Sequence, residues 1–549
     1  MKTRNLLLTG LLSMGMLAAC TNDDDPGAQG SNNDDGNTAY AQIAISVSAN
    51  SVGTRADNEV KDNTTGASTG DQINGSENEN NVSKVTVVLA DVNTDIAQYV
   101  YNFSTANTDF FVGDNKTDFA TKPFEVPQGK YHVYVLANYG DNGISANVAP
   151  GFDMKQEIDI SNASKLYTTN GFLMANDGIA TESNFTGTAT GKEVDGDLKD
   201  KADGATLHKV EVNIERVVSK VTFAADASHP NNQYPVKDAN GNKLATATVN
   251  SVALINTNKK MFLIREAKTA TKKPNVVTGT WIYPQDPNYS TVLQGGDQAT
   301  TEASWLKDNF ANPSADADDF KDITGENAAV FYCPENTMAA AAQQNGQTTG
   351  VVYKVTWAFE SNAKPYTELS KDGSDAYSKI FAAILKLSSG KDDDITEQIF
   401  TSNPAEGTAA GTFYAYNNLI FKNKNAAILY KCIVEATGTT DNDKASSANT
   451  AFTSAKSAAL PAAIDEYTGG VNYYPVWIKH NPDGGNMEQD KYGVVRNHWY
   501  ELTVTGISNL GNSKPTFDKP EDPDDAKVAN IQVAAKIKPW TLVKQDVEL

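Results

Sequence analysis

The sequence has few of the residues from which catalytic and metal sites are usually built. Its 549 residues include only three cysteines and five histidines. The patterns H-E-x-x-H, C-x-x-C and G-x-S-x-G are missing, and the stretch GTATGKE has the wrong spacing for a phosphate loop. The acidic stretch EVDGDLKD lacks the ligand spacing of an EF-hand. We therefore expect no metal, no cofactor and no enzymatic activity, although the many carboxylates leave a paired-carboxylate glycosidase open.

Positive charge is also scarce, and arginine most of all. Asp and Glu outnumber Lys and Arg by 68 to 46, which gives a net charge of −22 and a pI near 4.7. Nucleic acids and anionic membrane surfaces would repel such a chain, so neither is an expected partner. Only five of the 46 basic residues are arginines, and Arg55 is the only one between Thr21 and Glu215. An arginine-specific protease would therefore find a single target in that stretch.

No hydrophobic run approaches the ~20 residues of a membrane-spanning helix. The run Leu6–Ala19 carries no charge and has the basic flank and the small-residue end of a secretory signal peptide. It ends in the tetrad LAAC, which resembles the lipobox of bacterial lipoproteins. The resemblance implies that residues 1–20 form the signal segment and that Cys20 is acylated, which anchors the precursor in the outer membrane. The acidic residues 23–25 resemble the signal that exports such lipoproteins to the outside of that membrane.

Strand patterns dominate the rest of the chain. After a polar tether at residues 21–39, the stretch YAQIAISVSAN places Ile43, Ile45 and Val47 on one face, with the period of two of a half-buried strand. Farther along, runs such as QGKYHVYVLANYG alternate in the same way between turns of Asn, Gly and Asp. Spacing typical of βαβ units does not occur. These patterns predict a mainly β protein built of β-sandwiches.

The same patterns divide the chain into parts. Residues 21–55 hold the tether and the first strand, residues 56–208 an N-terminal sandwich, and residues 209–549 a longer C-terminal sandwich. Within the last part, the stretch DAYSKIFAAILKLSSG (residues 375–390) gathers its apolar side chains on one face at helical spacing. We therefore expect two mainly β domains, the second with helical insertions.

Two pairs of residues leave alternatives open. Cys333 and Cys432 could form a disulfide in an oxidising compartment, although two buried free thiols are slightly favoured. His480 and His498 flank the turn region PDGGN and could meet across a hairpin. Exposed histidines at strand ends meet in this way more often without a metal than with one.

Four stretches resemble the recurring motifs of Bacteroides-type fimbrillins, specifically the Mfa-type major subunit of the short fimbria: PQGKYHVYVLANYG, NIERVVSKVTF, VVRNHWYELTVTGISNLG and AAKIKPWTLVKQDVEL. The resemblance extends from the lipobox to Leu549 and is weak in the middle of the second domain. It implies two transthyretin-like β-sandwich domains and a type V pilus subunit that supports adhesion and biofilm formation. It also implies export as an outer-membrane lipoprotein precursor, cleavage after an arginine by a surface protease, and polymerisation by strand exchange into a cell-surface fimbrium. Its partners would be copies of itself and the fimbrial anchor and tip subunits.

The residues indicate where these steps would take place. Arg55 lies in SVGTRADNE, between the first strand and an acidic flexible segment that can enter a protease cleft, and Ala56 would begin the mature chain. Loss of the first strand would open a groove, to which a strand of another subunit can add. The expected donor strand spans about residues 530–549, and its apolar residues are Ile531, Val533, Ala535, Ile537, Trp540 and Leu542.

Three other functions compete with the shaft subunit. A fimbrial anchor would resist cleavage, and a tip subunit would lack the donor strand. A surface glycan-binding lipoprotein would keep its lipid and present a concave aromatic platform. An enzyme would gather titratable groups in a cleft. The combination of a cleavage site with a donor strand favours the shaft subunit.

Overall fold

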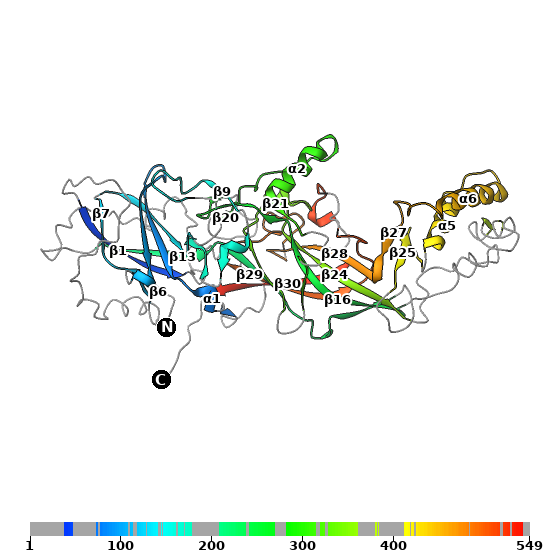
Figure 1. Cartoon of the computed structure of the whole chain (residues 1–549), viewed down its shortest axis with the longest axis horizontal. Coiled ribbons are helices and arrows are strands. Elements are labelled where there is room, and N and C mark those ends of the chain that lie inside the picture. The colour runs from blue at the N-terminus through cyan, green and yellow to red at the C-terminus, as the bar shows by residue number, and fades with distance from the viewer. Residues whose placement is uncertain are drawn as a thin grey trace.

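A computed structural model of the chain describes residues 38–47, 73–74, 77–107, 110–112, 118–127, 129–140, 144, 147–160, 163–168, 171–177, 208–237, 241–269, 282–313, 319–323, 328–360, 379–380, 383, 411–417, 419–421, 424–482, 484–515, 520–526 and 530–541. The described parts form an elongated, mainly β molecule (Figure 1). Strand β1 (Thr38–Val47) lies at one end, and helices α5 (Lys424–Val434) and α6 (Asp441–Ala455) lie at the other. The expected mainly β fold class is confirmed.

The first sheet contains nine strands from the N-terminal part of the chain. Besides β1 they are β3 (Lys84–Asp91), β4 (Ala97–Ser104), β5 (Phe110–Val112), β6 (Asp118–Thr121), β7 (Phe124–Pro127), β8 (Tyr131–Ala137), β12 (Met174–Asn176) and β13 (His208–Arg216). Their order is β4-β3-β8-β12-β13-β1-β6-β5, and β7 also pairs with β1.

This sheet curls so that distant strands meet across a common core. The rings of Tyr101 and Phe103 on β4 have their centroids 4.9 Å from that of Phe124 on β7, although several strands separate β4 from β7 in the sheet. Aromatic contacts of this kind bury a large apolar surface. The enclosed side chains form one continuous hydrophobic cluster, as in a β-sandwich.

Two five-stranded sheets make up the second part. One consists of β2 (Ile73–Asn74), β14 (Val218–Phe223), β23 (Val330–Pro334), β29 (His498–Ile507) and β30 (Ile531–Thr541), and the other of β15 (Gln233–Lys237), β16 (Lys243–Ile255), β22 (Lys321–Asp322), β24 (Gly350–Phe359) and β28 (Val471–Trp477). The first has the order β2-β30-β29-β14-β23, and the second the order β15-β16-β24-β28 with β22 beside β16. Apolar side chains of both sheets share one core. The two sheets therefore form a second sandwich.

Helices are attached to this second sandwich. Helices α5 and α6 have a core of their own with a small sheet of β25 (Phe413–Tyr416), β26 (Leu419–Phe421) and β27 (Asp465–Tyr467). In the expected helix at residues 375–390, the described positions 379, 380 and 383 are helical, and Ile380 joins this core. Another helix is α2 (Ala299–Asn309). The helical insertions are thus confirmed. No described helix is long and apolar enough to cross a membrane.

Short strand pairs complete the fold. They are β9 (Glu157–Asp159) with β18 (Lys260–Phe262), β10 (Tyr167–Thr168) with β11 (Gly171–Phe172), β17 (Thr257–Asn258) with β21 (Phe310–Ala311), and β19 (Ala267–Thr269) with β20 (Ile282–Pro284). The β9–β18 pair links the first part of the chain to the second.

The junction between the two parts is built from buried charges. The chain crosses it from β13 to β14, where the Nε of Arg216 donates to the backbone carbonyl of Glu79 at 2.9 Å. Glu79 belongs to the short helix α1 (Glu77–Asn80), and its carboxylate lies 2.7 Å from the Nζ of Lys220. Nearby, Arg265 and Glu215 form a fully buried ion pair at 2.6 Å. Buried charges need such partners, because desolvation would otherwise destabilise the fold.

Candidate functional site

Strand β1 lies inside the first sheet, with partner strands on both sides. One edge pairs in parallel with β13 over residues 41–47. The other edge pairs in antiparallel orientation with β6 and with β7. Removal of β1 would therefore leave a slot within the sheet, with unpaired backbone groups along both of its walls.

Alternate side chains of β1 fill the first core. Ala41, Ile43, Ile45 and Val47 are at most 5% exposed, while Ser46 points to solvent. Burial of an aliphatic side chain of this size contributes about 1.5–3 kcal/mol. The three residues that we expected in the displaced strand, Ile43, Ile45 and Val47, thus fill the slot on its core side.

Thr121 covers an interruption in one wall of the slot. The pairing of β1 with β6 ends at Ala44 and that with β7 begins at Ala41, so the residues between face no strand partner on this side. The Oγ1 of Thr121 accepts a hydrogen bond from the backbone N–H of Ile43 at 3.0 Å. Its carbonyl oxygen accepts one from the Nε2 of Gln42 at 2.9 Å. The fully buried Thr121 thereby replaces the missing ladder contacts.

Strands β5, β6 and β7 are joined to the rest of the sheet through β1. β5 pairs with β6, and both β6 and β7 pair with β1. Among the described strands, no other strand pairs with these three. Without β1, side-chain packing such as that of Phe119 and Phe124 in the core would hold them in place.

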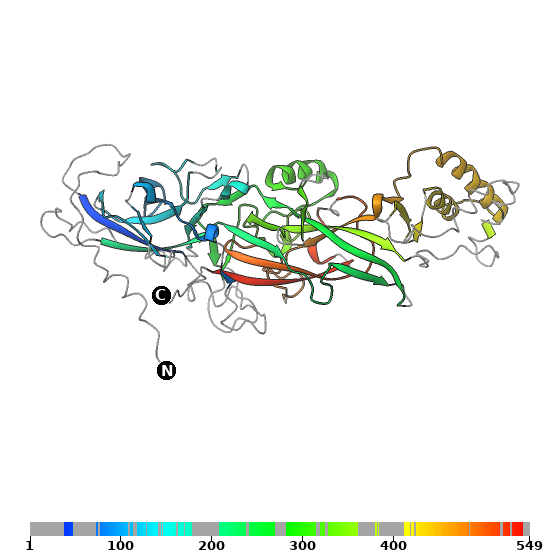
Figure 2. The same cartoon turned by 60° about the horizontal axis from the view of Figure 1, so that its bottom comes forward.

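The C-terminal strand β30 is an integral part of the second sandwich. It pairs with β29 in antiparallel orientation at nine positions, and at its end Trp540 pairs with Ile73 of β2. Ile531 is buried, whereas Val533 and Ala535 are half-buried and pack against the core. Figure 2 shows β30, in red, extending along the second part toward the junction. Ile537 and Trp540 lie in the strand, but their side chains are outside the described set.

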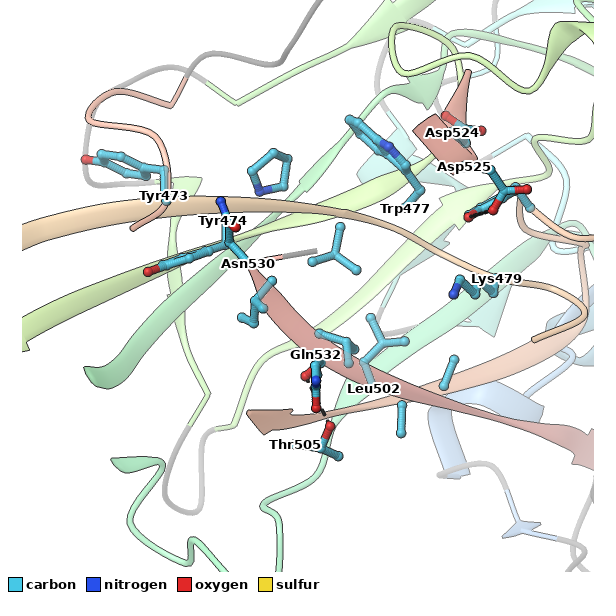
Figure 3. Close-up of a pocket in the computed structure, with 18 of the residues that line it drawn as sticks. Tyr473, Tyr474, Trp477, Lys479, Leu502, Thr505, Asp524, Asp525, Asn530 and Gln532 are labelled. Carbon is cyan, nitrogen blue, oxygen red and sulfur yellow. Dashed lines mark hydrogen bonds between the residues drawn. The ribbon is translucent and has the colours of Figure 1, made fainter. Parts of the chain in front are cut away.

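A groove of about 410 Å³ runs beside β30 (Figure 3). One side is formed by β28, the last strand of its sheet, with Pro475 and Val476. The opposite side is formed by Val533 and Ala535 of β30. The two sheets of the second sandwich are therefore open to solvent along β30, and this strand is less enclosed than β1.

Two aspartates at one end of the groove have opposite pKa shifts. Burial raises the pKa of Asp524 to about 8, and its carboxylate accepts a hydrogen bond from the hydroxyl of Thr348. Burial alone would also raise the pKa of Asp525, but hydrogen bonds from Lys491, Met487 and Tyr492 lower it below its usual value. Asp524 is therefore neutral in the folded protein at neutral pH, while Asp525 is ionised.

The histidines and cysteines that the sequence analysis singled out have structural surroundings. His480 and His498 do meet, with ring centroids 5.3 Å apart, but His480 is buried rather than exposed, and its Nδ1 lies 2.7 Å from the hydroxyl oxygen of Tyr500. Cys333 and Cys432 are free thiols in two different cores. Within the described ranges, no three His, Cys, Asp or Glu side chains gather as a metal site requires.

Several expected sites lie outside the described residues. They are Cys20, Arg55, Ala56, Leu542 and the acidic stretch at 193–200. Two residues at the candidate site were missed by the sequence analysis. No local pattern distinguishes Thr121, whose role depends on its position opposite β1. Glu79 likewise stands in a polar stretch, and only its contacts at the junction identify it.

A family model matches the C-terminal end of the chain. Residues 465–546 match the model described as "Major fimbrial subunit protein type IV, Fimbrillin, C-terminal". The chain carries a fimbrillin C-terminal region. This match includes β28, β29 and β30, the strands around the groove, and it confirms the resemblance to fimbrillins. No curated protein matches the chain.

Three solved structures with fimbrial descriptions are similar to this chain. The fimbrillin FimA from Porphyromonas gingivalis has 13% identity over 92% of this chain and 99% of its own, with a TM-score of 0.36. The tip fimbrial protein Mfa3 of the same organism has 11% identity over 92% and 100%, with a TM-score of 0.32. Its fimbrial anchor protein Mfa2 has 10% identity over 42% and 68%, with a TM-score of 0.22.

Proposed function

We propose that this fimbrillin is the structural shaft subunit of a surface fimbria, of the Mfa-type major kind found in type V pili. It is exported as a lipoprotein acylated at Cys20, cleaved between Arg55 and Ala56, and polymerised by strand exchange with copies of itself. Anchor and tip subunits complete the fimbria, which supports adhesion and biofilm formation. The observation that carries the proposal is the interior position of β1, which precedes Arg55 in the chain.

The distribution of arginine supports a single cleavage. Apart from Arg4 in the signal segment and Arg55, the chain has three arginines. These are Arg216, Arg265 and Arg496, and each is at most 3% exposed. A protease needs several residues of extended, accessible backbone, which buried positions at the domain junction do not offer. An arginine-specific protease would therefore cut the folded precursor at Arg55 and leave both sandwiches whole.

Cleavage would prepare the subunit to receive a strand. Once residues 1–55 are no longer joined to the rest of the chain, β1 is held in its slot by non-covalent contacts alone. Its departure exposes the backbone groups of β13, β6 and β7 together with an apolar trough. Donation of a strand by a neighbouring subunit restores both the hydrogen bonds and the burial.

Strand β30 is the proposed donor. It has the period-two apolar face that the slot requires, and its bordering groove leaves it less enclosed than β1. On transfer it would lose its hydrogen bonds with β29 and gain similar ones in the slot. The slot would otherwise be empty, and filling it restores burial worth about 1.5–3 kcal/mol for each large aliphatic side chain, against the contacts that Ile531, Val533 and Ala535 give up in their own core.

Variants at Arg55 test the proposal. Arg55→Ala should leave a folded, surface-bound subunit that does not polymerise, because β1 remains covalently attached. Arg55→Lys is the matched control: it keeps the positive charge, and an arginine-specific protease should still fail to cut it. N-terminal sequencing of wild-type polymer sheared from cells should begin at Ala56. Fibres from either variant, or a mature chain that begins elsewhere, would refute cleavage at this site.

The same measurement separates the shaft subunit from accessory subunits. An anchor would be recovered uncut at the base of the fimbria, in about one copy for each fibre. A tip subunit would be recovered only at the free end. A shaft subunit should be cleaved, and antibodies against it should mark the whole length of the fibre in immunogold electron microscopy.

A further inference from the structure

The C-terminal strand is similar to β1 in sequence pattern. Residues 39–47 read AYAQIAISV and residues 529–537 read ANIQVAAKI. Aligned without a gap, Gln42 corresponds to Gln532, and Ile43 corresponds to Val533. The apolar phase is the same in both strands: Ala41, Ile43 and Ile45 face the first core, and Ile531, Val533 and Ala535 pack against the second.

The two matched glutamines have different surroundings. The amide of Gln42 donates to the carbonyl of Thr121 at the interruption between β6 and β7. The side chain of Gln532 is exposed in its own sandwich and forms no hydrogen bond with any described residue. The backbone carbonyl of Gln532 accepts a hydrogen bond from the hydroxyl of Thr505 at 3.4 Å, drawn as a dashed line in Figure 3. The Gln532 side chain is therefore dispensable for the fold of its own subunit.

We infer that β30 enters the slot of the next subunit in the direction and register of β1, and that Thr121 selects this register by binding Gln532 in place of Gln42. The inference rests on the strand exchange proposed above. In the joined state, the backbone N–H of Val533 donates to the Oγ1 of Thr121, as that of Ile43 does in the precursor. The Gln532 side chain then donates to the Thr121 carbonyl.

Apolar periodicity alone cannot select this register. A shift of one residue would turn the apolar face outward, but a shift of two residues would keep it inward. After a shift of two, Asn530 or Ala534 would stand opposite Thr121. The Asn side chain is one methylene shorter and Ala has no amide, so the carbonyl of Thr121 would lose the hydrogen bond that Gln42 makes to it in the precursor. The loss of this bond disfavours the shifted registers.

Cysteine pairs in the full chain, expressed in cells that build fimbriae, report the register. In the precursor Ser46 stands directly opposite Asp118, so Lys536 should take that position in the polymer. Lys536→Cys with Asp118→Cys should give a disulfide between subunits, because cross-strand neighbours have the required separation. Ala534→Cys with Asp118→Cys reports a shift of two residues. Lys536→Cys with Lys209→Cys reports the reversed direction and keeps Gln532, because Lys209 stands opposite Gln42 in the precursor. The native Cys333 and Cys432 are buried and contribute little background.

Gln532→Leu tests the selection itself. Its precursor should be secreted with unchanged thermal stability, because the replaced side chain is exposed and bonds to no described residue. In its polymer no register offers Thr121 an amide of the right length, so the disulfide between positions 536 and 118 should lose its predominance, and that between positions 534 and 118 should appear beside it. Gln42→Leu is the matched control. It should leave the polymer disulfides unchanged, because residue 42 is removed on maturation.

The outcomes separate the inference from the strand exchange on which it rests. Disulfides only in the shifted or reversed pair would overturn the inferred register and leave strand exchange in place. If Gln532→Leu formed the same disulfides between subunits as the wild type, Thr121 would not select the register. Fibres with no disulfide between residues 531–537 and the next first sandwich, in any pair, would refute the proposed strand exchange itself.

Discussion

The carboxylate of Glu79 and the ammonium of Lys220 lie 2.7 Å apart, and both side chains are buried where the two sandwiches meet. Glu79 belongs to α1, in the stretch that follows Arg55, and the hydroxyl of Tyr332 also donates to its carboxylate. Lys220 lies on β14, with its Nζ 3.9 Å from the ring centroid of Trp499. The beginning of the mature chain is thus fastened at the junction, and α1 would stay attached there after the loss of residues 1–55.

Removal of the charge at Glu79 should destabilise the protein. In Glu79→Gln, Lys220 loses its ion-pair partner in a buried environment, and we expect the free energy of unfolding to fall by about 3–5 kcal/mol. Urea denaturation of the purified protein measures the loss. Glu360→Gln is the control, because the ion pair of Glu360 with Lys243 is largely exposed and should contribute about 0–1 kcal/mol. If Glu79→Gln and Glu360→Gln lost equal free energy of unfolding, the buried ion pair at the junction would contribute no more to stability than the exposed one.

Asp524 should make stability depend on pH. Its pKa is raised to about 8 in the folded state, so between pH 4 and pH 8 the unfolded chain releases a proton that the folded chain keeps. The stabilisation is full below pH 4 and is lost as pH rises through 8, with a slope of up to about 1.4 kcal/mol per pH unit.

Asp524→Asn should flatten this dependence, since the amide does not titrate. Urea unfolding at pH 5 and pH 8 gives the difference for the wild type and the variant. Asp522→Asn, at a half-buried position two residues earlier, is the control and should behave as the wild type. If the free energy of unfolding of Asp524→Asn changed with pH as steeply as that of the wild type, Asp524 would be ionised in the folded protein.

Replacement of Cys20 should stop the subunit before it reaches the cell surface. Without its thiol, Cys20→Ala cannot be acylated, and stable attachment to a membrane needs at least two acyl chains or equivalent signals. We expect the precursor to accumulate uncut in the periplasm, detected by cell fractionation and by labelling with palmitate. Fimbriae on Cys20→Ala cells would rule out the lipoprotein route.

A chain that ends at Ala535 should fold and mature but fail to assemble. It keeps Ile531, Val533 and Ala535 in their own core and five of the nine paired positions with β29, so it should still fold and be cleaved, with a thermal stability below that of the wild type. The remaining donor is too short to fill the slot that β1 occupies over residues 41–47. Electron microscopy should find no fibres. If fibres of normal length formed, the donor strand would lie elsewhere in the chain.

Much of this protein could be predicted from its sequence, because the relevant signals are local. The alternation of Ile43, Ile45 and Val47 with polar neighbours predicts a half-buried strand wherever that strand lies in the fold. Helical spacing in residues 375–390 is equally local, and its described positions are helical. The match between residues 39–47 and 529–537 is also present in the sequence and could have been found by searching for internal repeats.

Only the tertiary structure decided how these elements meet. Period-two alternation is the same for edge and interior strands, so it could not place β1 between β13 and the pair β6 and β7. Those partners lie about 70 to 170 residues away, and their pairing depends on long-range register rather than on local preference. Thr121 and Glu79 have no distinguishing neighbours in sequence. Their roles come from burial opposite Gln42 and Lys220, which only the folded chain brings within hydrogen-bonding distance.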